Sequence, residues 1–352
     1  MDISDKKSLK RDYRVYGVDI ARILSMLMVV FLHNLLAGGI LRENDTSFSN
    51  LTYWLVENVM IVAVNIFAMI SGYLLVDRKI RPAKLLELWK VVFFWSAIPT
   101  VVLMLSLKEI DIVGLVKSFF PILTNQYWYF NAYVVLFILA PFLNAGIRVL
   151  SVQYLQKIVL SLLILSASAG FLGNLFLEGG YSALWLIIMY LTGGMIKKSR
   201  FSRKVVPNKW LILTCLLCVF TSLVGEYVSI KYLGQPSEWI KYTSPIVIIQ
   251  SISLFILFTR IKVSHVRTKK ILKKISPLTF AVYLVDSNPF FFHKILHSSL
   301  SFLNQLNIWL GLGCLLTLSL GMFLIVILLE SGRSWLFTRI RNNKQLDWEN
   351  KL

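Results

Sequence analysis

Residues 19–34 read DIARILSMLMVVFLHN and place Arg22 and His33 inside an apolar run that is suited to a membrane span. Ionisable groups inside a bilayer are costly, so they are rare and usually functional. Roughly three helical turns plus about 20° separate the two residues, so their side chains share one face of the predicted helix. They lie on the order of 16 Å apart along its axis. This spacing predicts the two ends of one buried path.

The rest of the chain continues the apolar pattern of this first run. It has 352 residues, of which 57% are hydrophobic, whereas soluble domains are about 45–50% apolar. We therefore predict an all-α, polytopic integral membrane protein with about ten transmembrane helices. The predicted spans cover 16–40, 54–76, 89–107, 127–143, 154–173, 182–196, 210–230, 243–260, 277–293 and 307–330. The runs at 127–143, 182–196 and 277–293 are short, so we expect extended, tilted or broken helices there.

The basic residues predict how the chain crosses the membrane. Most Lys and Arg residues fall in the segments on one side of this topology, which marks that side as cytoplasmic and places both termini there. The opposite side has only Arg42, Lys108, Lys117, Lys231, Lys241 and Lys294. This distribution explains most of the net charge of +19, so we expect no nucleic-acid partner. The basic face should attract anionic membrane lipid and any polyphosphate ligand.

The same segmentation predicts the domain organisation. We expect a basic cytoplasmic leader at 1–15, a membrane domain at 16–330 and a basic cytoplasmic tail at 331–352. No soluble domain is expected in addition to the membrane domain, because the gaps between the apolar runs are short.

The cysteines give no reason to expect metal or redox chemistry. All three fall in apolar runs: Cys215, Cys218 and Cys314. Small residues of this kind usually pack between membrane helices. We therefore predict neither a disulfide framework nor a metal site.

One stripe of the first span carries most of the unusual side chains. Asp19 lies three residues before Arg22, so the two can pair across one helical turn. Asp19 also lies within about 40° of His33 on the helix. The alternative is that Arg22 snorkels to the inner interface and His33 packs against a neighbour. Because the pair shares one face, we favour the functional interpretation.

The sequence resembles the membrane acyltransferase-3 family along nearly its whole length. Arg22, ten intervening residues and His33 match that family's R-x10-H pattern. Further blocks resemble the family in the same order: YGVDIA at 16–21, NIFAMISGYL at 65–74, YWYF at 127–130, LAPFL at 139–143, YLTGG at 190–194 and SPLTFAVYLV at 276–285.

The chain departs from the family pattern at one position. The family often has a His soon after the last block, where this sequence has Asp286, followed by Ser287, Asn288 and Pro289. An Asp can accept a hydrogen bond or orient a His, but it lacks the pKa range of imidazole. His293, two helical turns further on, is a possible substitute or an interfacial residue.

The resemblance implies transfer of an acyl group, usually acetyl from acetyl-CoA, to a sugar hydroxyl of a surface glycan or its lipid-linked precursor. His33 suits a general base for that hydroxyl, or it accepts the acyl group itself and passes it on. Arg22 suits the phosphates of the donor or the oxyanion of the thioester. Lys197 and Lys198 belong to basic loops that suit the coenzyme's phosphates, although plain positive-inside charge is the simpler explanation for each loop.

Other polar or aromatic residues have weaker cases. Glu57, Asp286 and Asn288 are expected either to line a cavity or to make hydrogen bonds between helices. Trp128 belongs either to the aromatic belt of the membrane interface or to a site that stacks on the acceptor sugar. Ser71 precedes Gly72 and is expected to permit close helix packing, since a Ser nucleophile would need a nearby base.

We therefore expect a multi-pass O-acyltransferase of a bacterial inner membrane that acts on a cell-surface polysaccharide and works without a metal. Many members of the family carry a C-terminal esterase-like domain, and we expect none here because the sequence ends soon after the tenth predicted span. It is thus expected to transfer the acyl group directly or to hand it to other polysaccharide-biosynthesis proteins. Two alternatives are an exporter of polysaccharide or lipid-linked sugar without covalent chemistry, and a transmembrane acyl shuttle that feeds a partner enzyme.

Overall fold

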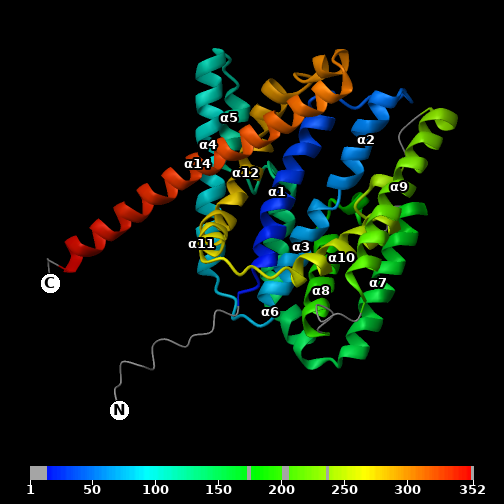
Figure 1. The fold of residues 1–352 in the computed structure, drawn as a ribbon. Helices are drawn as coiled ribbons and strands as arrows, with labels where there is room; N and C mark the ends of the chain where they lie inside the picture. Colours follow the sequence, from blue (N-terminus) through cyan, green and yellow to red (C-terminus); the bar gives the residue numbers. More distant parts are fainter. Residues whose placement is uncertain (1–13, 173–175, 200–205, 235–237, 350–352) are drawn as a thin grey trace.

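The computed structural model describes residues 14–172, 176–199, 206–234 and 238–349, and every regular element in these ranges is helical (Figure 1). The longer helices are α1 (Tyr16–Leu36), α2 (Phe48–Met60), α3 (Ala63–Leu75), α4 (Ala83–Leu107), α6 (Trp128–Val149), α7 (Val152–Leu172), α8 (Ala183–Lys198), α9 (Asn208–Leu233), α10 (Pro245–Arg260) and α14 (Ile308–Glu349). The shorter helices are α5 (Ile112–Phe119), α11 (Val266–Ile275), α12 (Thr279–Asp286) and α13 (Pro289–Phe291). Single 3-10 or π turns cover Glu178–Gly180, Glu238–Ile240, Ser276–Leu278, Phe292–Leu296 and Ser301–Gln305.

Several of these helices are long and apolar enough to cross a membrane. Within the described residues there are six such segments: Tyr16–Leu36, Phe48–Leu75, Ala83–Leu107, Trp128–Val149, Asn208–Leu233 and Ile308–Ile340. Val152–Ser168 and Pro245–Arg260 are shorter apolar helices. The predicted all-α membrane architecture is thus confirmed. The number of about ten spans and the cytoplasmic placement of both termini stay predictions.

Helix boundaries differ from the sequence-based expectation in three places. Two segments expected to be loops form helices, α5 and α11. The short run at 277–293, where an extended, tilted or broken helix was expected, is indeed broken after α12, because Pro289 lacks an N–H and disfavours helical backbone at Asn288 (φ −60°, ψ 123°). Helix α14 continues beyond 330 to Glu349, and Figure 1 shows its C-terminal part extending away from the bundle.

The centre of the bundle is the contact between α3 and α8. A Cβ atom on Gly72 of α3 would lie 1.9 Å from the carbonyl oxygen of Tyr190, and one on Gly193 of α8 would lie 2.0 Å from that of Met69. These two glycines therefore let the helix backbones touch, as small residues do between membrane helices. We expected the Ser-Gly pair at 71–72 to permit close helix packing, and the approach of Tyr190 to Gly72 is the structural basis for that role.

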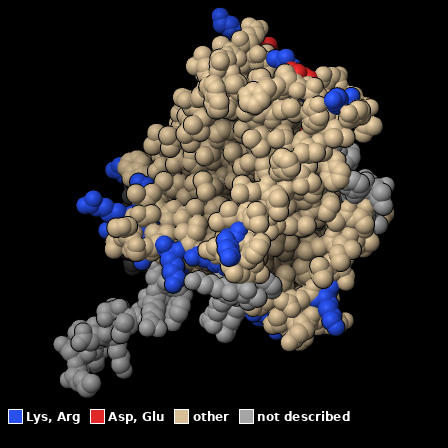
Figure 2. Space-filling view, turned by 45° about the vertical axis from the view of Figure 1, so that its right-hand side comes forward, with Lys and Arg blue, Asp and Glu red and all other residues tan. Residues whose placement is uncertain are grey.

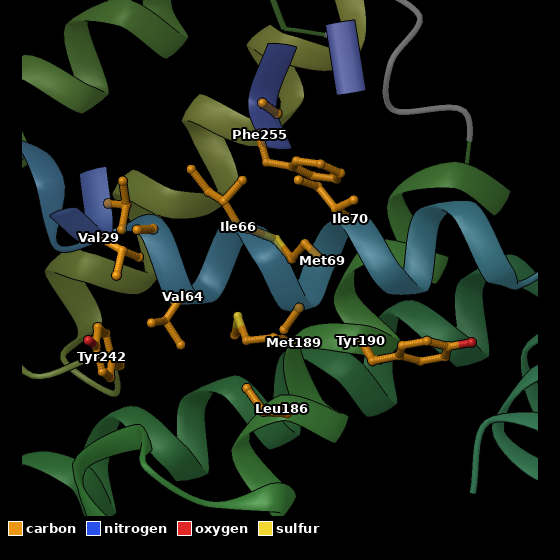
Figure 3. Packing of buried hydrophobic residues seen from close by; sticks show 14 of the residues in the cluster. Val29, Val64, Ile66, Met69, Ile70, Leu186, Met189, Tyr190, Tyr242 and Phe255 are labelled. Carbon is orange, nitrogen blue, oxygen red and sulfur yellow. The ribbon is translucent and has the colours of Figure 1, made fainter. Parts of the chain in front are cut away.

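Helix α3 also packs against α10 on its other side. In Figure 3, Ile66 and Ile70 point from α3 toward Phe255 of α10, while Met189 of α8 lies on the opposite side. All four side chains are buried. The broken unit of α2 and α3 is thereby held at a fixed position beside α1, which carries the candidate site.

Charged side chains gather toward the two ends of the bundle. Figure 2 shows a broad face without charged side chains, bordered by Lys and Arg below and along the left margin and by Lys, Arg, Asp and Glu at the upper end. A charge-free face of this kind suits contact with lipid hydrocarbon, because an ionised side chain there would lose its hydration.

Candidate active site

His33 and Asp286 form the closest polar contact between α1 and α12. The Nδ1 atom of His33 lies 2.6 Å from Oδ2 of Asp286. The carboxylate is fully buried, whereas 24% of the His33 side chain is exposed. A carboxylate only accepts hydrogen bonds, so it fixes the proton on Nδ1 and leaves the lone pair of Nε2 facing away. An imidazole held in this tautomer is suited to accept a proton from a ligand.

The break in the ninth apolar run positions Asp286. Asn288 caps the next short helix, since its Oδ1 accepts hydrogen bonds from the backbone N–H groups of Phe290 and Phe291. Its Nδ2 donates to the carbonyl oxygen of Ser96 and to the hydroxyl of Thr100 on α4. Asn288 thus ties the broken segment to α4 and does not line the cavity at His33.

His33 lines a cavity with mostly apolar and aromatic walls, which we call the histidine cavity. Its one other side chain of Asp, Glu, Lys, Arg or His type among the described residues is Glu57. Its remaining walls are Met26, Val29, Leu32, Leu36, Ile61, Val64, Phe67, Trp128, Tyr129, Tyr181, Tyr242, Phe280 and Tyr283. Phe292 packs edge-on against the His33 ring at 5.3 Å between centroids and further restricts its rotation.

A second cavity, which we call the basic cavity, lies around Arg22. Its lining includes the cationic side chains Arg14, Arg22, Arg78, Lys197 and Lys273. Three of them come from separate segments: Arg78 follows α3, Lys197 lies in the last turn of α8 and Lys273 lies in the last turn of α11. A site with this many cations is suited to a ligand with several negative charges.

The ion pairs around this cavity differ from the expected arrangement. Asp19 accepts hydrogen bonds from Arg14 at 2.6 and 2.7 Å, so the predicted pair of Asp19 with Arg22 is wrong. Arg14 reaches Asp19 because it lies just before Val15, the N-cap of α1, and offers two N–H groups to the carboxylate. Among the described residues, Arg22 makes its hydrogen bond to the neutral hydroxyl of Ser276, at 3.3 Å. Its charge is therefore not neutralised by a bonded carboxylate.

A third cavity, the connecting cavity, adjoins both of the others. It shares Arg22, Ser71 and Tyr133 with the basic cavity. It shares Phe67, Tyr129 and Phe280 with the histidine cavity. The three cavities therefore lie in line along α1, from Arg22 to His33. This is the arrangement that the spacing of these two residues predicted.

The family model of an acyltransferase domain matches residues 15–330. The chain belongs to the acyltransferase-3 family. It is thus a membrane acyltransferase, which agrees with the resemblance carried by the sequence blocks. No curated protein and no solved structure gives a match.

The other predicted site residues of this acyltransferase fall into two groups. Lys197 lines the basic cavity, where its ammonium lies 2.8 Å from Asp77 and over the ring of Tyr73. Lys198 is not brought there: it donates to the carbonyl oxygens of Ile147 and Arg148, at 2.6 and 2.9 Å, and to that of Leu150. A cation at the C-terminal end of α6 stabilises that helix, so its position supports a structural role.

Ser71 and Trp128 both line the row of three cavities, but they line different cavities. Ser71 lines the basic and connecting cavities, and its hydroxyl donates to the carbonyl oxygen of Phe67 at 3.3 Å. No histidine of the described residues lines either cavity, so Ser71 has no evident base. Trp128 lines the histidine cavity. His293 is exposed and lines a separate cavity, so the partner of His33 is Asp286.

Sequence reasoning missed several aromatic residues of the path. Tyr129 and Tyr133 are four residues apart on α6 and line the connecting cavity, a spacing that could have indicated one shared helix face. Tyr181 and Tyr242 precede α8 and α10, and only the fold brings them to the histidine cavity. Nothing in the spacing of these two residues indicates that they meet.

Proposed function

We propose that this acyltransferase moves an acyl group, most commonly acetyl, from acyl-CoA to a hydroxyl of a cell-surface polysaccharide or its lipid-linked precursor. The observation that carries the proposal is the line of three cavities, with a multiply cationic end at Arg22 and an oriented imidazole at His33. A transferase needs a cationic site to bind a polyanionic donor and a base to activate a neutral hydroxyl.

The basic cavity is the proposed donor end. Coenzyme A carries phosphates, which planar guanidinium groups bind in a bidentate manner and ammonium groups bind as point charges. Arg22 has no hydrogen-bonded carboxylate among the described residues, so it is the cation best placed for a phosphate or for the thioester oxygen. The acyl thioester then extends through the connecting cavity toward His33.

At the other end, His33 is the proposed general base. The acceptor hydroxyl attacks the thioester carbonyl while Nε2 of His33 takes its proton, so a C–O bond forms and the C–S bond breaks. The proton then passes from His33 to the departing thiolate. Asp286 stabilises the imidazolium that exists between these two transfers. A variant of this route has His33 accept the acyl group before the sugar does.

The positive-inside distribution of Lys and Arg supports a donor that enters from the cytoplasm of a bacterial cell. Helix α1 begins at the basic cavity and has His33 in its last turn, so the acceptor end lies toward the opposite side of the membrane. Anionic lipid, a glycan or lipid-linked sugar and other polysaccharide-biosynthesis proteins are the proposed partners.

The test is transfer of radiolabelled acetyl from acetyl-CoA by purified protein in lipid nanodiscs, with and without glycan from a strain that lacks the gene. We expect labelled glycan from wild type, and from His33→Ala a rate lower by about 10²- to 10⁴-fold, the usual contribution of a general base. Insertion of the variant is checked by its thermal unfolding. Transport of glycan into proteoliposomes of the same protein with no use of acetyl-CoA would indicate the exporter, and thioester cleavage without labelled glycan would indicate the shuttle.

A further inference from the structure

Glu57 is a buried acid for which the transfer chemistry gives no role. Its side chain is fully buried on α2, one turn before the break between α2 and α3. Neither carboxyl oxygen has a hydrogen-bond partner in the described part of the chain. An unsatisfied buried carboxyl group is costly, so a native structure that retains one usually uses it. Glu57 lines the histidine cavity, where a ligand can supply the missing donors.

Three aromatic side chains form a cluster in the same cavity. The rings of Trp128 and Tyr181 lie 4.6 Å apart between centroids, and those of Tyr181 and Tyr242 lie 5.1 Å apart. Trp128 and Tyr242 are nearly parallel, at 26° and 6.4 Å. Glu57 is close enough to Tyr181 and Tyr242 to interact with them electrostatically. The flat faces of aromatic rings can stack on the C–H bonds of a sugar, and a neighbouring acceptor can take hydrogen bonds from its hydroxyl groups. The aromatic cluster and Glu57 together therefore suit a sugar ring.

This cluster lies at the opposite end of the bundle from the donor cavity. Tyr181 precedes α8, whereas Lys197 of the basic cavity lies near its other end, on the order of 20 Å further along the helix axis. Tyr181 is half exposed, so the cluster reaches the surface of the protein at this end. A ligand that enters here meets His33 without passing the basic cavity.

The charges of the cavity restrict which sugar fits. No Lys or Arg is among the described residues that line it. Glu226 of α9 is also buried and interacts electrostatically with Glu57. A carboxylate on the ligand would therefore meet acidic groups without a cation to balance it, which costs free energy in a buried site.

We propose that Glu57, Trp128, Tyr181 and Tyr242 form the acceptor subsite, which binds a neutral sugar residue and excludes acidic sugars. The proposal rests on the acyl transfer proposed above. The aromatic rings stack on one face of the sugar, and Glu57 accepts hydrogen bonds from its hydroxyl groups. The hydroxyl to be acylated then faces Nε2 of His33.

Direct binding tests the subsite independently of catalysis. The protein in nanodiscs is titrated with the hexasaccharides of glucose, mannose and galactose and with that of galacturonic acid. We expect at least one neutral hexasaccharide to bind and the acidic one to bind more weakly. Glu57→Gln and Trp128→Ala should each weaken neutral binding by about 10- to 100-fold. The first replaces one charged acceptor oxygen by an NH2 donor, and the second removes the stacking ring. The matched control is Glu330→Gln, because Glu330 of α14 is also a buried acid but does not line the cavity.

Kinetics provide the second readout. With labelled acetyl-CoA and the neutral hexasaccharide that binds best, Glu57→Gln should raise the acceptor KM and leave the acetyl-CoA KM unchanged. Equal neutral binding by wild type and Glu57→Gln, no neutral binding by wild type, or tighter binding of the acidic sugar would each overturn the subsite. Neutral binding that depends on Glu57 in a protein that never consumes acetyl-CoA would support the subsite and refute the acyl transfer.

Discussion

The two ends of α1 have opposite kinds of surroundings. The cavity at Arg22 is lined by cations from the leader, α1, α8, α11 and the segment after α3, several of which are exposed. The cavity at His33 is lined mainly by aromatic and aliphatic side chains, with one histidine and one glutamate. The first suits a ligand recognised by its charge, and the second suits a ligand recognised by its shape and hydroxyl groups. Helix α1 can contribute to both cavities because its length keeps the two cavities apart.

The two ends of α1 should also differ in how much a single substitution costs. At the basic end several cations share one task, so the loss of one is partly compensated by the rest. At the histidine end a single imidazole depends on a single buried carboxylate, at 2.6 Å. Substitutions at the two ends should therefore differ in size and in the kinetic constant that changes.

The largest expected effect is that of Asp286→Asn. The amide would donate to Nδ1 of His33 and leave the ring proton on Nε2, so the lone pair that should face the acceptor is lost. We expect kcat to fall by about 10²- to 10⁴-fold with the KM for acetyl-CoA unchanged. Steady-state kinetics measure both constants.

Asp286→His is the matched variant, because it introduces the residue that the family often carries. A neutral imidazole can still accept from Nδ1, so this variant should retain more activity than Asp286→Asn. Equal rates for Asp286→Asn and wild type would show that the carboxylate does not orient the base.

Arg22→Ala should have the next largest effect, at the opposite end. The loss of a charge-assisted contact to a phosphate or thioester oxygen should raise the KM for acetyl-CoA by about 10- to 100-fold. Arg22→Lys keeps the charge without the planar fork and should recover part of the loss. If instead the acceptor KM rises and the acetyl-CoA KM does not, the assignment of the two ends is reversed.

The smallest effects should distinguish two neighbouring lysines. Lys197→Ala removes one of several cations from the basic cavity, so the acetyl-CoA KM should rise by only about two- to fivefold. Lys198→Ala should leave that KM unchanged but lower the thermal stability, because the carbonyl groups at the end of α6 lose their cation. A change of the acetyl-CoA KM in Lys198→Ala that matches the change in Lys197→Ala would contradict the division between them.

The sequence predicted the residues of the path better than their partners. The period of the α-helix was enough to place Arg22 and His33 on one face, since both belong to one uninterrupted helix. Asp19 shows the limit of such local reasoning. A partner three residues away is available, yet Arg14 provides two N–H groups in a better geometry. Lys197 and Lys198 are likewise adjacent in sequence, but helical rotation directs one to the cavity and the other to α6.

The sequence by itself determined the helical membrane architecture, the basic segments and the aligned pair on α1, because hydrophobicity and helical period are local properties of the chain. Only the tertiary structure decided that Asp286 orients His33, since α1 and α12 are far apart in the sequence and meet only because the fold packs them against each other. The same holds for the aromatic cluster beside Glu57, whose members come from three separate segments. A contact between distant segments depends on how helices cross, and glycines such as Gly72 and Gly193 fix that crossing by letting backbones touch.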